Sequence, residues 1–551
     1  MWRVANKLYY ATRAGREVYI GSMSTRPVLR GTSYAISTRK PQATQAAERI
    51  LLEGGNAFDA AVAAMAALAV TDPAMTGIGG DANILVYVAA EKKVRAINAT
   101  GATPKLATID WYRRNAGGKI PVSDGLLCGT VPGVPAACYT LLERWGSMNF
   151  ADATYAGVEL AKNGFPVSEY FLEFVTGHAA KLHKYRETER IYFAGGRELK
   201  AGDILRNPDL AETLAAMGDR DAFYKGEIAR TLARFSEAHG GLFRYEDFAG
   251  YQAQVGEPIS VNYRGFEVYK NASACQGATE LVLLNLLENH DLKSLGHNSA
   301  DYLHLCIEAA KLAYADRERY LGDMDFIHIP FEEVLSKSRV RHAPDLSANL
   351  AGSASHVGDT SYIAIVDKHR NCVSMTPSLH SAFGTGVTMG STGLIFNCRG
   401  DCFVLDENHP NALMPGKRPR STLTPSLVLR DGEPFLVMGS PGGDDQPLRI
   451  AQTFLNVVDF GMNIQDAIEA PRWSTTSFPA TEFPQTAYPN QIAVEERIDE
   501  NVRAALAQRG HVVETTGPWF LGANCAVMVD QTTGVLSAGA DPRGDSYALA
   551  W

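Results

Sequence analysis

Apolar residues recur at helical spacing through QATQAAERILLEGGNAFDAAVAAMAALAVTDP, residues 42–73, and predict two consecutive helices. Gly54 and Gly55 offer a left-handed stop for the first helix, and Asn56 offers an N-cap for the second. The second helix is rich in alanine, so it can pack closely against its neighbours. Its apolar run, residues 57–70, is too short for a bilayer, which takes about 20 residues to cross. The run therefore predicts a buried helix.

The pattern changes from helices to strands along the chain. A glycine turn and an apolar strand are predicted over 77–88, amphipathic helices over 150–250, and a strong helix over 300–322. From Thr360 onward, alternating apolar residues predict strands, several of them joined by hairpin-like turns such as RDGE at residues 430–433. This order favours an α+β fold with stacked sheets between helical layers.

The composition is that of an ordinary globular protein, with 551 residues of which 46% are hydrophobic and 21% charged. At about 150 residues per domain the length suggests three or four domains, and AGSASHVG, residues 351–358, is the best candidate boundary. The net charge of -9 and the lack of a basic stripe argue against a nucleic-acid-binding protein. A small-molecule enzyme is therefore the better expectation.

The cysteines and the N-terminus bear on where the protein works. The eight cysteines are scattered and form no CxxC pair, which is typical of buried thiols in a reducing compartment rather than of a disulfide framework or a zinc site. Residues 1–23 show no apolar core or cleavage motif of a secretory signal. They are basic, with a faint likeness to an organelle transit segment. We expect a cytoplasmic protein.

Most familiar catalytic and cofactor motifs are missing. Gly77-x-Gly79-x-x-Ala82 approaches a dinucleotide fingerprint, but it follows a helix and opens a strand, which is the reverse of the required order. The sequence has no GxSxG elbow, phosphate-binding loop or HExxH helix, and Met438 stands where an elbow in MGSPGG would need glycine. Standard serine-hydrolase, nucleotide and zinc-protease activities are therefore excluded.

Two other segments are candidates for chemistry. SPGG, residues 440–443, closes an apolar strand with two glycines, whose N–H groups could converge on an oxyanion. The same glycines would also suit a turn that needs positive φ. In RPRSTLTPSLVL, residues 418–429, Ser421 and Thr422 are either site hydroxyls or turn formers.

The chain resembles the γ-glutamyltransferase (γ-glutamyl transpeptidase) family of N-terminal-nucleophile hydrolases over about 500 residues. The motifs that carry the resemblance occur in the family's order: ILLEGGNAFDAAVAAMAALAVTDP, GIGGDANILV, GTVPGV, GDILRNPDLAETL, FYKGEIA, YRGFEVY, EAAKLAYADRERYLGD, GDTSYIAIVD, FGTGV, PGKRPRSTLTPSLVL, GSPGG and ADPRG. The resemblance implies a four-layer αββα sandwich, assembled from two chains of one self-cleaved precursor.

The resemblance places the self-cleavage between Asp359 and Thr360. It implies an N-terminal extension (1–40), a helix-rich large subunit (41–359) and a strand-rich small subunit (360–551) that begins at the nucleophile. The two chains would form a heterodimer, with a dimer of these as a further possibility.

Cleavage gives Thr360 a free α-amine, whose ordinary pKa of about 7.7–8.0 suits it to take the hydroxyl proton. By family analogy Gly442 and Gly443 donate to the tetrahedral oxyanion, and Ser378 lies close to the nucleophile. Neither a metal nor an organic cofactor is implied.

The substrate anchors of the family do not carry over to this chain. Thr100 stands where the family has an arginine for the substrate's α-carboxylate. His380 and Cys402 stand where an asparagine and an acid hold its α-amine, unless a one-residue shift gives the acid's role to Asp401. Each lost charge-assisted hydrogen bond is worth roughly 1.5–3 kcal/mol. Glutathione is therefore expected to be a poor substrate.

Two further departures point the same way. Arg399 replaces a glutamine of the family's set, and Tyr362 replaces a histidine two residues after the nucleophile. Together with His380, Arg399 leads us to expect an acyl group with its own, differently placed polar or acidic handle. Similar branches of the family include oxamate-type amidohydrolases, cephalosporin-acylase-like enzymes and some that cleave a C–C bond.

We therefore expect a self-processing amide hydrolase or acyltransferase that acts through an acyl-Thr360 intermediate on a small amide other than a γ-glutamyl compound. One alternative is a true γ-glutamyl transpeptidase or glutathione hydrolase. An alternative of another class is an unprocessed, non-catalytic homologue that acts as a binding protein. No nucleic-acid or membrane partner is expected.

Overall fold

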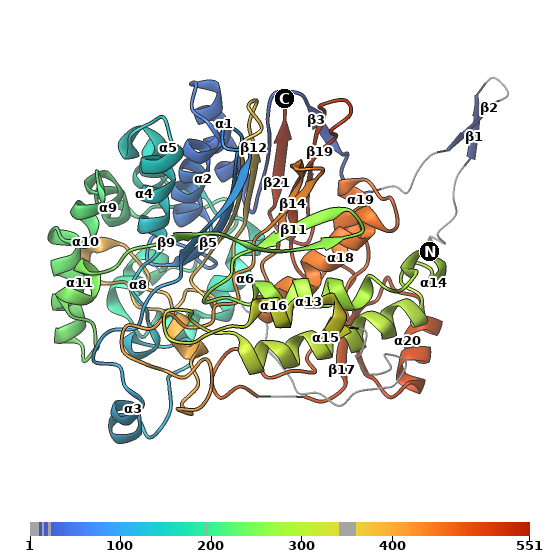
Figure 1. The fold of residues 1–551 in the computed structure, drawn as a ribbon. Helices are drawn as coiled ribbons and strands as arrows, with labels where there is room; N and C mark the ends of the chain where they lie inside the picture. The colour runs from blue at the N-terminus through green and yellow to red at the C-terminus, as the bar shows by residue number, and fades with distance from the viewer. Residues whose placement is uncertain (1–9, 14–15, 20–23, 194–195, 341–359, 487) are drawn as a thin grey trace.

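Two antiparallel seven-stranded sheets, stacked face to face, form the centre of the protein (Figure 1). The computed structural model describes the chain except for residues 1–9, 14–15, 20–23, 194–195, 341–359 and 487. The proposed cleavage residue Asp359 and the candidate boundary 351–358 lie outside the described residues. None of the helices in the described ranges is long and apolar enough to cross a membrane.

The first sheet holds the segment that begins at Thr360. Its strands, in spatial order, are β21 (Tyr547–Ala550), β4 (Ala35–Thr38), β12 (Ile363–Val366), β13 (Cys372–Ser378), β5 (Asp81–Val88), β6 (Lys93–Ala99) and β9 (Gln254–Gly256). Strands β4, β12, β13 and β5 are buried along their whole length. This explains why β12 and most of β5 are continuous apolar runs, whereas β4 and β13 also bury small polar residues.

The second sheet contains the strand that leads into the SPGG turn, β15 (Glu433–Gly439). Its strands, in spatial order, are β10 (Ile259–Tyr263), β11 (Phe266–Lys270), β14 (Ser426–Arg430), β15 (Glu433–Gly439), β19 (Cys525–Val529), β20 (Leu536–Ala540) and β3 (Leu29–Gly31). The predicted hairpin joins β14 to β15. Its central residues Asp431 and Gly432 have φ of 51° and 80°, as a two-residue hairpin turn of the primed type requires.

Helices cover the outer face of each sheet. The first sheet packs against α1 (Pro41–Leu52), α2 (Ala57–Thr71) and α4 (Val134–Trp145), and α5 (Phe150–Asn163) packs on α2. The second packs against α13 (Gly277–Leu287), α18 (Gln446–Val458) and α19 (Ile464–Glu469), and α15 (Ala300–Tyr320) packs on α13. The predicted helix pair is confirmed: Gly54 has φ of 99°, and the Asn56 side chain accepts from the N–H groups of Phe58 and Asp59.

Three separate apolar cores show that the layers are stacked in the order αββα. One core lies between the first sheet and its helices, and another between the second sheet and its helices. A third consists almost entirely of strand residues from both sheets, among them Leu85, Ala364, Leu427 and Val527. Successive strand residues face opposite sides, so each buried strand contributes to two cores. The predicted fold class is confirmed.

The expected division at residue 40 is corrected by the structure. Strands β3 and β4 lie within residues 1–40, and each belongs to one of the two main sheets. The sequence motif that suggested the boundary starts only at the first helix, and a four-residue strand such as AIST carries too little periodicity to be recognised. An extension that stands outside the sandwich could therefore include only residues before Leu29.

Strands from both sides of the Asp359–Thr360 bond pair with one another in both sheets. β12 pairs with β4 and β13 pairs with β5 in the first sheet, while β14 pairs with β11 and β20 with β3 in the second. In the described residues helices still predominate before this bond and strands after it, but strands of both parts belong to the same two sheets. Cleavage at this bond would leave two chains held together by backbone hydrogen bonds across both sheets.

Candidate active site

Thr360 lies just ahead of β12 and is fully buried. The N–H of Ser361 donates to the carbonyl of Pro377 (3.0 Å), which extends the pairing of this segment with β13. The Thr360 Oγ1 atom lies 3.3 Å from Ser378 Oγ and 3.3 Å from Gln446 Nε2. The expected proximity of Ser378 and Thr360 is thus present. Gln446 was not anticipated from the sequence.

Ser378 is the last residue of β13, where it pairs in register with Asp81 at the start of β5. Its Oγ accepts the backbone N–H of His380 at 2.7 Å. His380 has φ of 81°, a backbone conformation that residues other than glycine adopt rarely. The strand therefore ends in a sharp bend, and Ser378 at that bend contacts Thr360.

The SPGG segment forms a tight turn between β15 and α18. Gly442 has φ of 127° and Gly443 has φ of 54°, so the turn does need positive φ at both positions. A Cβ on Gly442 would lie 1.9 Å from Nη1 of Arg449, and that same Nη1 donates to the carbonyl of Pro441 at 3.0 Å. Gln276 Nε2 donates to the carbonyl of Gly443 at 3.0 Å. The turn is therefore held rigidly on both sides.

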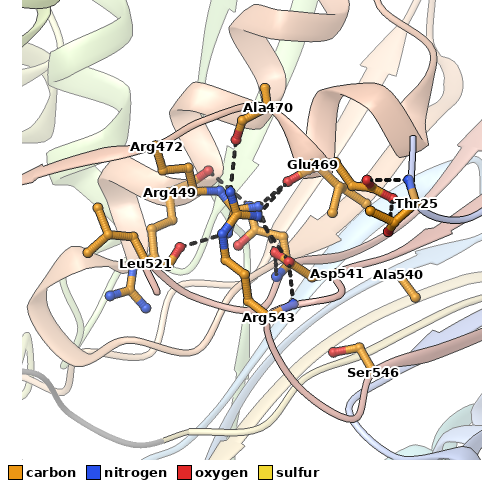
Figure 2. Close-up of polar contacts among 12 residues, drawn as sticks. Thr25, Arg449, Glu469, Ala470, Arg472, Leu521, Ala540, Asp541, Arg543 and Ser546 are labelled. Atoms are coloured by element: carbon orange, nitrogen blue, oxygen red, sulfur yellow. Dashed lines mark hydrogen bonds and ion pairs between the residues drawn. The ribbon is translucent and has the colours of Figure 1, made fainter. Parts of the chain in front are cut away.

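A buried ionic network that includes Asp541, Arg472 and Arg543 lies close to Arg449 (Figure 2). The Asn524 side chain donates to the Arg449 carbonyl (3.1 Å), and the Asn524 N–H donates to Asp541 (2.8 Å). Asp541 also pairs with Arg472 at 2.7 Å and with Arg543 at 3.0 Å. These arginines hold the pKa of the Asp541 carboxyl below its usual range against the opposing effect of burial. The ADPRG motif is thus a structural support of the SPGG turn.

We expect Arg543→Leu to destabilise the protein strongly. Both carboxylate oxygens of Glu495 and one of Asp541 bind Arg543, and all three side chains are buried. Removing one partner of a buried ionic network leaves uncompensated charge and costs about 3–5 kcal/mol. The measurement is the urea midpoint of unfolding. Arg234→Leu, which removes an exposed pair with Glu227, should leave that midpoint nearly unchanged. Equal midpoints for the two variants would contradict this role.

Arg399 is fully buried and already paired. Its Nε and Nη2 donate to the two carboxylate oxygens of Asp81 at 3.0 and 3.1 Å, and its Nη1 donates to Thr422 Oγ1 at 3.0 Å. Burial raises the pKa of Asp81, and the Arg399 guanidinium opposes that rise. The cation expected from the sequence is present at the site, but Asp81 balances its charge.

His380 forms a second buried pair, with Asp401. Its Nδ1 lies 2.8 Å from the Asp401 carboxylate. Burial lowers the pKa of His380, but Cys402 and Asp401 raise it by more, so that its pKa lies well above the ordinary value. Cys402 Sγ is 3.6 and 3.7 Å from the two ring nitrogens. A sulfur equidistant from both cannot lie along either N–H direction, so Cys402 and His380 do not form an aligned nucleophile–base pair.

The remaining predicted residues divide between the site and the core. Ser421 Oγ lies 3.2 Å from the Asn83 amide, which donates to it, and 3.5 Å from the Thr100 hydroxyl. Ser421 and Thr100 are therefore brought together next to the Arg399–Thr422 contact. Tyr362 instead lies in the core between the sheets, where its hydroxyl contacts Ser374. The structure thus gives Tyr362 a packing role.

Sequence reasoning missed two residues that contact this group. Asp81 was visible only as the first residue of a predicted strand, although an unpaired Arg399 in a buried segment called for a carboxylate partner. Gln446 follows the SPGG turn within GGDDQP, and no motif marked it.

Two groups of buried side chains in the described residues have the composition of metal ligands. They are His380–Cys398–Asp401 and His304–Glu308–His511, and within each group the candidate ligand atoms lie within 4.8 Å of one another. Each group also contains a carboxylate that is paired with a cation, Asp401 with His380 and Glu308 with Lys311 at 2.7 Å. In the second group His304 Nδ1 also lies 2.8 Å from His511 Nε2, so these candidate ligand atoms already have protein partners.

Comparison with known proteins agrees with the fold and the motifs. The family model for gamma-glutamyltranspeptidase matches residues 43–551. The chain is 35% identical to the glutathione hydrolase-like YwrD proenzyme of Bacillus subtilis (strain 168), over 94% of this chain and 98% of that protein. It is 33% identical to the glutathione hydrolase proenzyme of Escherichia coli (strain K12), over 91% and 89%.

Among solved structures, the cephalosporin acylase from Bacillus halodurans superposes with a TM-score of 0.88 at 30% identity, and the match covers 98% of this chain and 99% of the other. The curated relatives are proenzymes, which indicates processing into a large and a small subunit that form a heterodimer. The fold, the motif order and these matches make the protein an autoprocessing amide hydrolase or acyltransferase, and the chain belongs to the gamma-glutamyltranspeptidase family of N-terminal-nucleophile hydrolases.

Proposed function

We propose that the precursor cuts itself between Asp359 and Thr360, and that Thr360 is then the nucleophile of a small-molecule amidase. The observation that carries this proposal is the position of Thr360 Oγ1, which contacts Ser378 and Gln446 in a buried group next to the SPGG turn. A threonine that only begins a strand would have no need of a hydroxyl buried against two polar side chains, or of a turn with two glycines at positive φ nearby.

In the proposed reaction Thr360 Oγ1 attacks the amide carbon while its proton passes to the α-amine of the same residue. An Oγ1–carbon bond forms, and the carbonyl oxygen takes up negative charge. The N–H groups of Gly442 and Gly443 donate to that oxygen. The carbon–nitrogen bond then breaks, and the α-amine returns the proton to the leaving amine. Water or an acceptor amine attacks the ester, which releases the acyl group and restores the hydroxyl.

Ser378 acts in this scheme as a positioning group for the nucleophile. Its Oγ accepts the His380 N–H at 2.7 Å, which fixes one of its lone pairs and sets its direction toward Thr360. Because that N–H belongs to the bend at the end of β13, the strand geometry itself orients the nucleophile. The side chain of His380 then turns away toward Asp401.

We further propose that the acyl group is polar but does not carry an amino-acid head. A γ-glutamyl group brings an ammonium and a carboxylate, and each needs a free countercharge at the site. Asp401 is occupied by His380, and Arg399 is occupied by Asp81. A zwitterion would have to break both buried pairs in order to bind, and losing two charge-assisted hydrogen bonds costs about 3–6 kcal/mol in total.

The test compares anilides on the matured protein. We expect kcat/KM for γ-glutamyl-p-nitroanilide to be at least about a hundredfold below that for the best uncharged acyl anilide of similar length, since 1.4 kcal/mol is a factor of ten. The variant His380→Asn, which releases the Asp401 carboxylate, should raise γ-glutamyl turnover relative to the uncharged substrate. Efficient γ-glutamyl hydrolysis by the unmodified protein would instead establish a true γ-glutamyl transpeptidase.

A further inference from the structure

We propose that Gln446 is a catalytic residue: its side-chain amide donates to the nucleophilic oxygen of Thr360. The inference rests on the proposed function, because it takes Thr360 Oγ1 as the reacting atom. Among the described residues two side chains contact that oxygen, the Ser378 hydroxyl and the Gln446 amide. A hydroxyl can donate or accept, whereas the Gln446 Nε2 group can only donate.

The orientation of the Gln446 amide follows from its second contact. Its Oε1 accepts the backbone N–H of Thr424 at 3.2 Å, while its Nε2 lies 3.3 Å from Thr360 Oγ1. Rotating the amide by half a turn would set its NH2 group against the N–H of Thr424, donor against donor. The backbone of the segment before β14 therefore decides which end of the amide faces Thr360. The side chain is fully buried, so water does not compete for either contact.

The position of Gln446 in the chain links it to the SPGG turn. It is the first residue of α18, three residues after Gly443, and Arg449 on the next turn of that helix donates to the Pro441 carbonyl. The start of α18 thus fixes two parts of the site at once. One part is the pair of glycines proposed to bind the carbonyl oxygen, and the other is the donor to the attacking oxygen. A shift of this helix end would move both together.

The contact matters whenever Thr360 Oγ1 carries negative charge. During attack the hydroxyl proton passes to the α-amine, and the oxygen is partly anionic before its bond to carbon is complete. During ester hydrolysis the same bond breaks, the electron pair returns to Oγ1, and the oxygen is anionic until it regains a proton. A donor to the charged form stabilises it in both steps. Gln446 would supply that donor without giving up a proton.

Substrate in its ground state gains nothing from this contact, since Gln446 faces the enzyme's own oxygen. Its removal should therefore lower kcat and leave KM nearly unchanged. Loss of one donor to a developing oxyanion costs 10²–10³ in kcat in strong cases. At 3.3 Å in the resting protein, we expect a loss of about 10- to 100-fold. Self-cleavage uses the same oxygen and should slow as well.

The experiment compares three variants. Gln446→Met keeps the size of the side chain and removes both contacts. Gln446→Glu keeps an acceptor for the Thr424 N–H and removes the donor. Gln452→Met is the matched control, since Gln452 is a buried glutamine of the same helix whose side chain binds the backbone of Leu448 and Trp473 instead of Thr360. Matured active sites are counted by burst titration, and kcat, KM, Tm and the time course of cleavage on a denaturing gel are recorded.

We expect both Gln446 variants to lose kcat per active site with KM within about twofold, and Gln452→Met to lower Tm while its kcat stays near that of the unmodified protein. A Gln446→Met protein that keeps its Tm but does not cleave itself also supports the proposal. If Gln446→Met does not fold, Gln446→Glu decides. Unchanged kcat in a folded, matured Gln446 variant overturns the role of Gln446 but leaves the proposed function intact. A Thr360→Ala protein that still matures would overturn the proposed function itself.

Discussion

Replacing Thr360 with alanine should leave one chain of 59.7 kDa on a denaturing gel and abolish amide hydrolysis. The unmodified protein should instead give bands of about 39 and 21 kDa, which are the masses of 359 and 192 of the 551 residues. Both outcomes depend on one atom, because Oγ1 would attack the peptide bond before Thr360 in the precursor and the substrate amide afterwards. Alanine removes that oxygen and changes little else in volume.

The control for this prediction is Thr360→Ser, which retains a hydroxyl and should mature and react, more slowly because serine lacks the methyl group that restricts the side-chain rotamer. Thr360→Ala should unfold at a temperature close to that of the precursor, since the strand pairs on either side of the cut are unaffected. A single full-length band from the unmodified protein would favour a non-catalytic binding homologue. Maturation of Thr360→Ala would show that the nucleophile is another residue.

The layered fold could be predicted because its main signals are local. The helix pair before Thr71 has a capped start at Asn56 and a glycine stop at Gly54, and the β14–β15 hairpin is marked by Asp431-Gly432. Strand order could not be predicted in the same way. β4 is four residues long and pairs with β12 more than 300 positions later, so nothing near it in the sequence marks it as a central strand.

The candidate site shows the same limit. Thr360, Ser378 and the two glycines could be predicted because each lies in a motif of consecutive residues. The pairing of Arg399 with Asp81 depends on the bend after β13 and on the register of β13 with β5, which together bring residues 318 positions apart into contact. Without knowledge of that register, we interpreted Arg399 as a free cation that would bind the substrate. Gln446 was missed for the same reason, because its partner Thr360 is 86 positions away.

The two buried pairs also have a structural consequence. Arg399 and Asp401 belong to one short 3-10 turn, residues 399–402. Each of the two residues connects this turn to a different segment at one end of the first sheet. Arg399 holds the start of β5 through Asp81, and Asp401 holds the segment after β13 through His380. The turn thus fixes the relative positions of the residues that surround Thr360. Its charges serve the architecture of the site first, which is why we assign no acidic substrate group to Arg399.

Gly442→Ala should lower kcat by about 10²–10³, the loss seen when one donor of an oxyanion hole is removed. Two independent features of the structure make alanine unacceptable here. The φ of 127° lies in a region that L-residues rarely adopt, and the added Cβ would meet Arg449 Nη1 at 1.9 Å. To relieve both, the turn must rotate and Arg449 must release the Pro441 carbonyl. Either movement displaces the N–H groups proposed to bind the oxyanion.

Gly461→Ala is the matched control for this variant. Gly461 follows the same helix α18 and also has positive φ, 67°, but a Cβ there would meet no atom within 4 Å. Both alanines carry backbone strain of order 1–3 kcal/mol, so both should lower Tm, whereas only the substitution at Gly442 should lower kcat. The measurement is kcat per titrated active site beside a thermal melt of each variant. Equal kcat in the two variants would mean that the SPGG turn contributes only to stability. The oxyanion would then be bound elsewhere, because moving these N–H groups would not have slowed the chemical step.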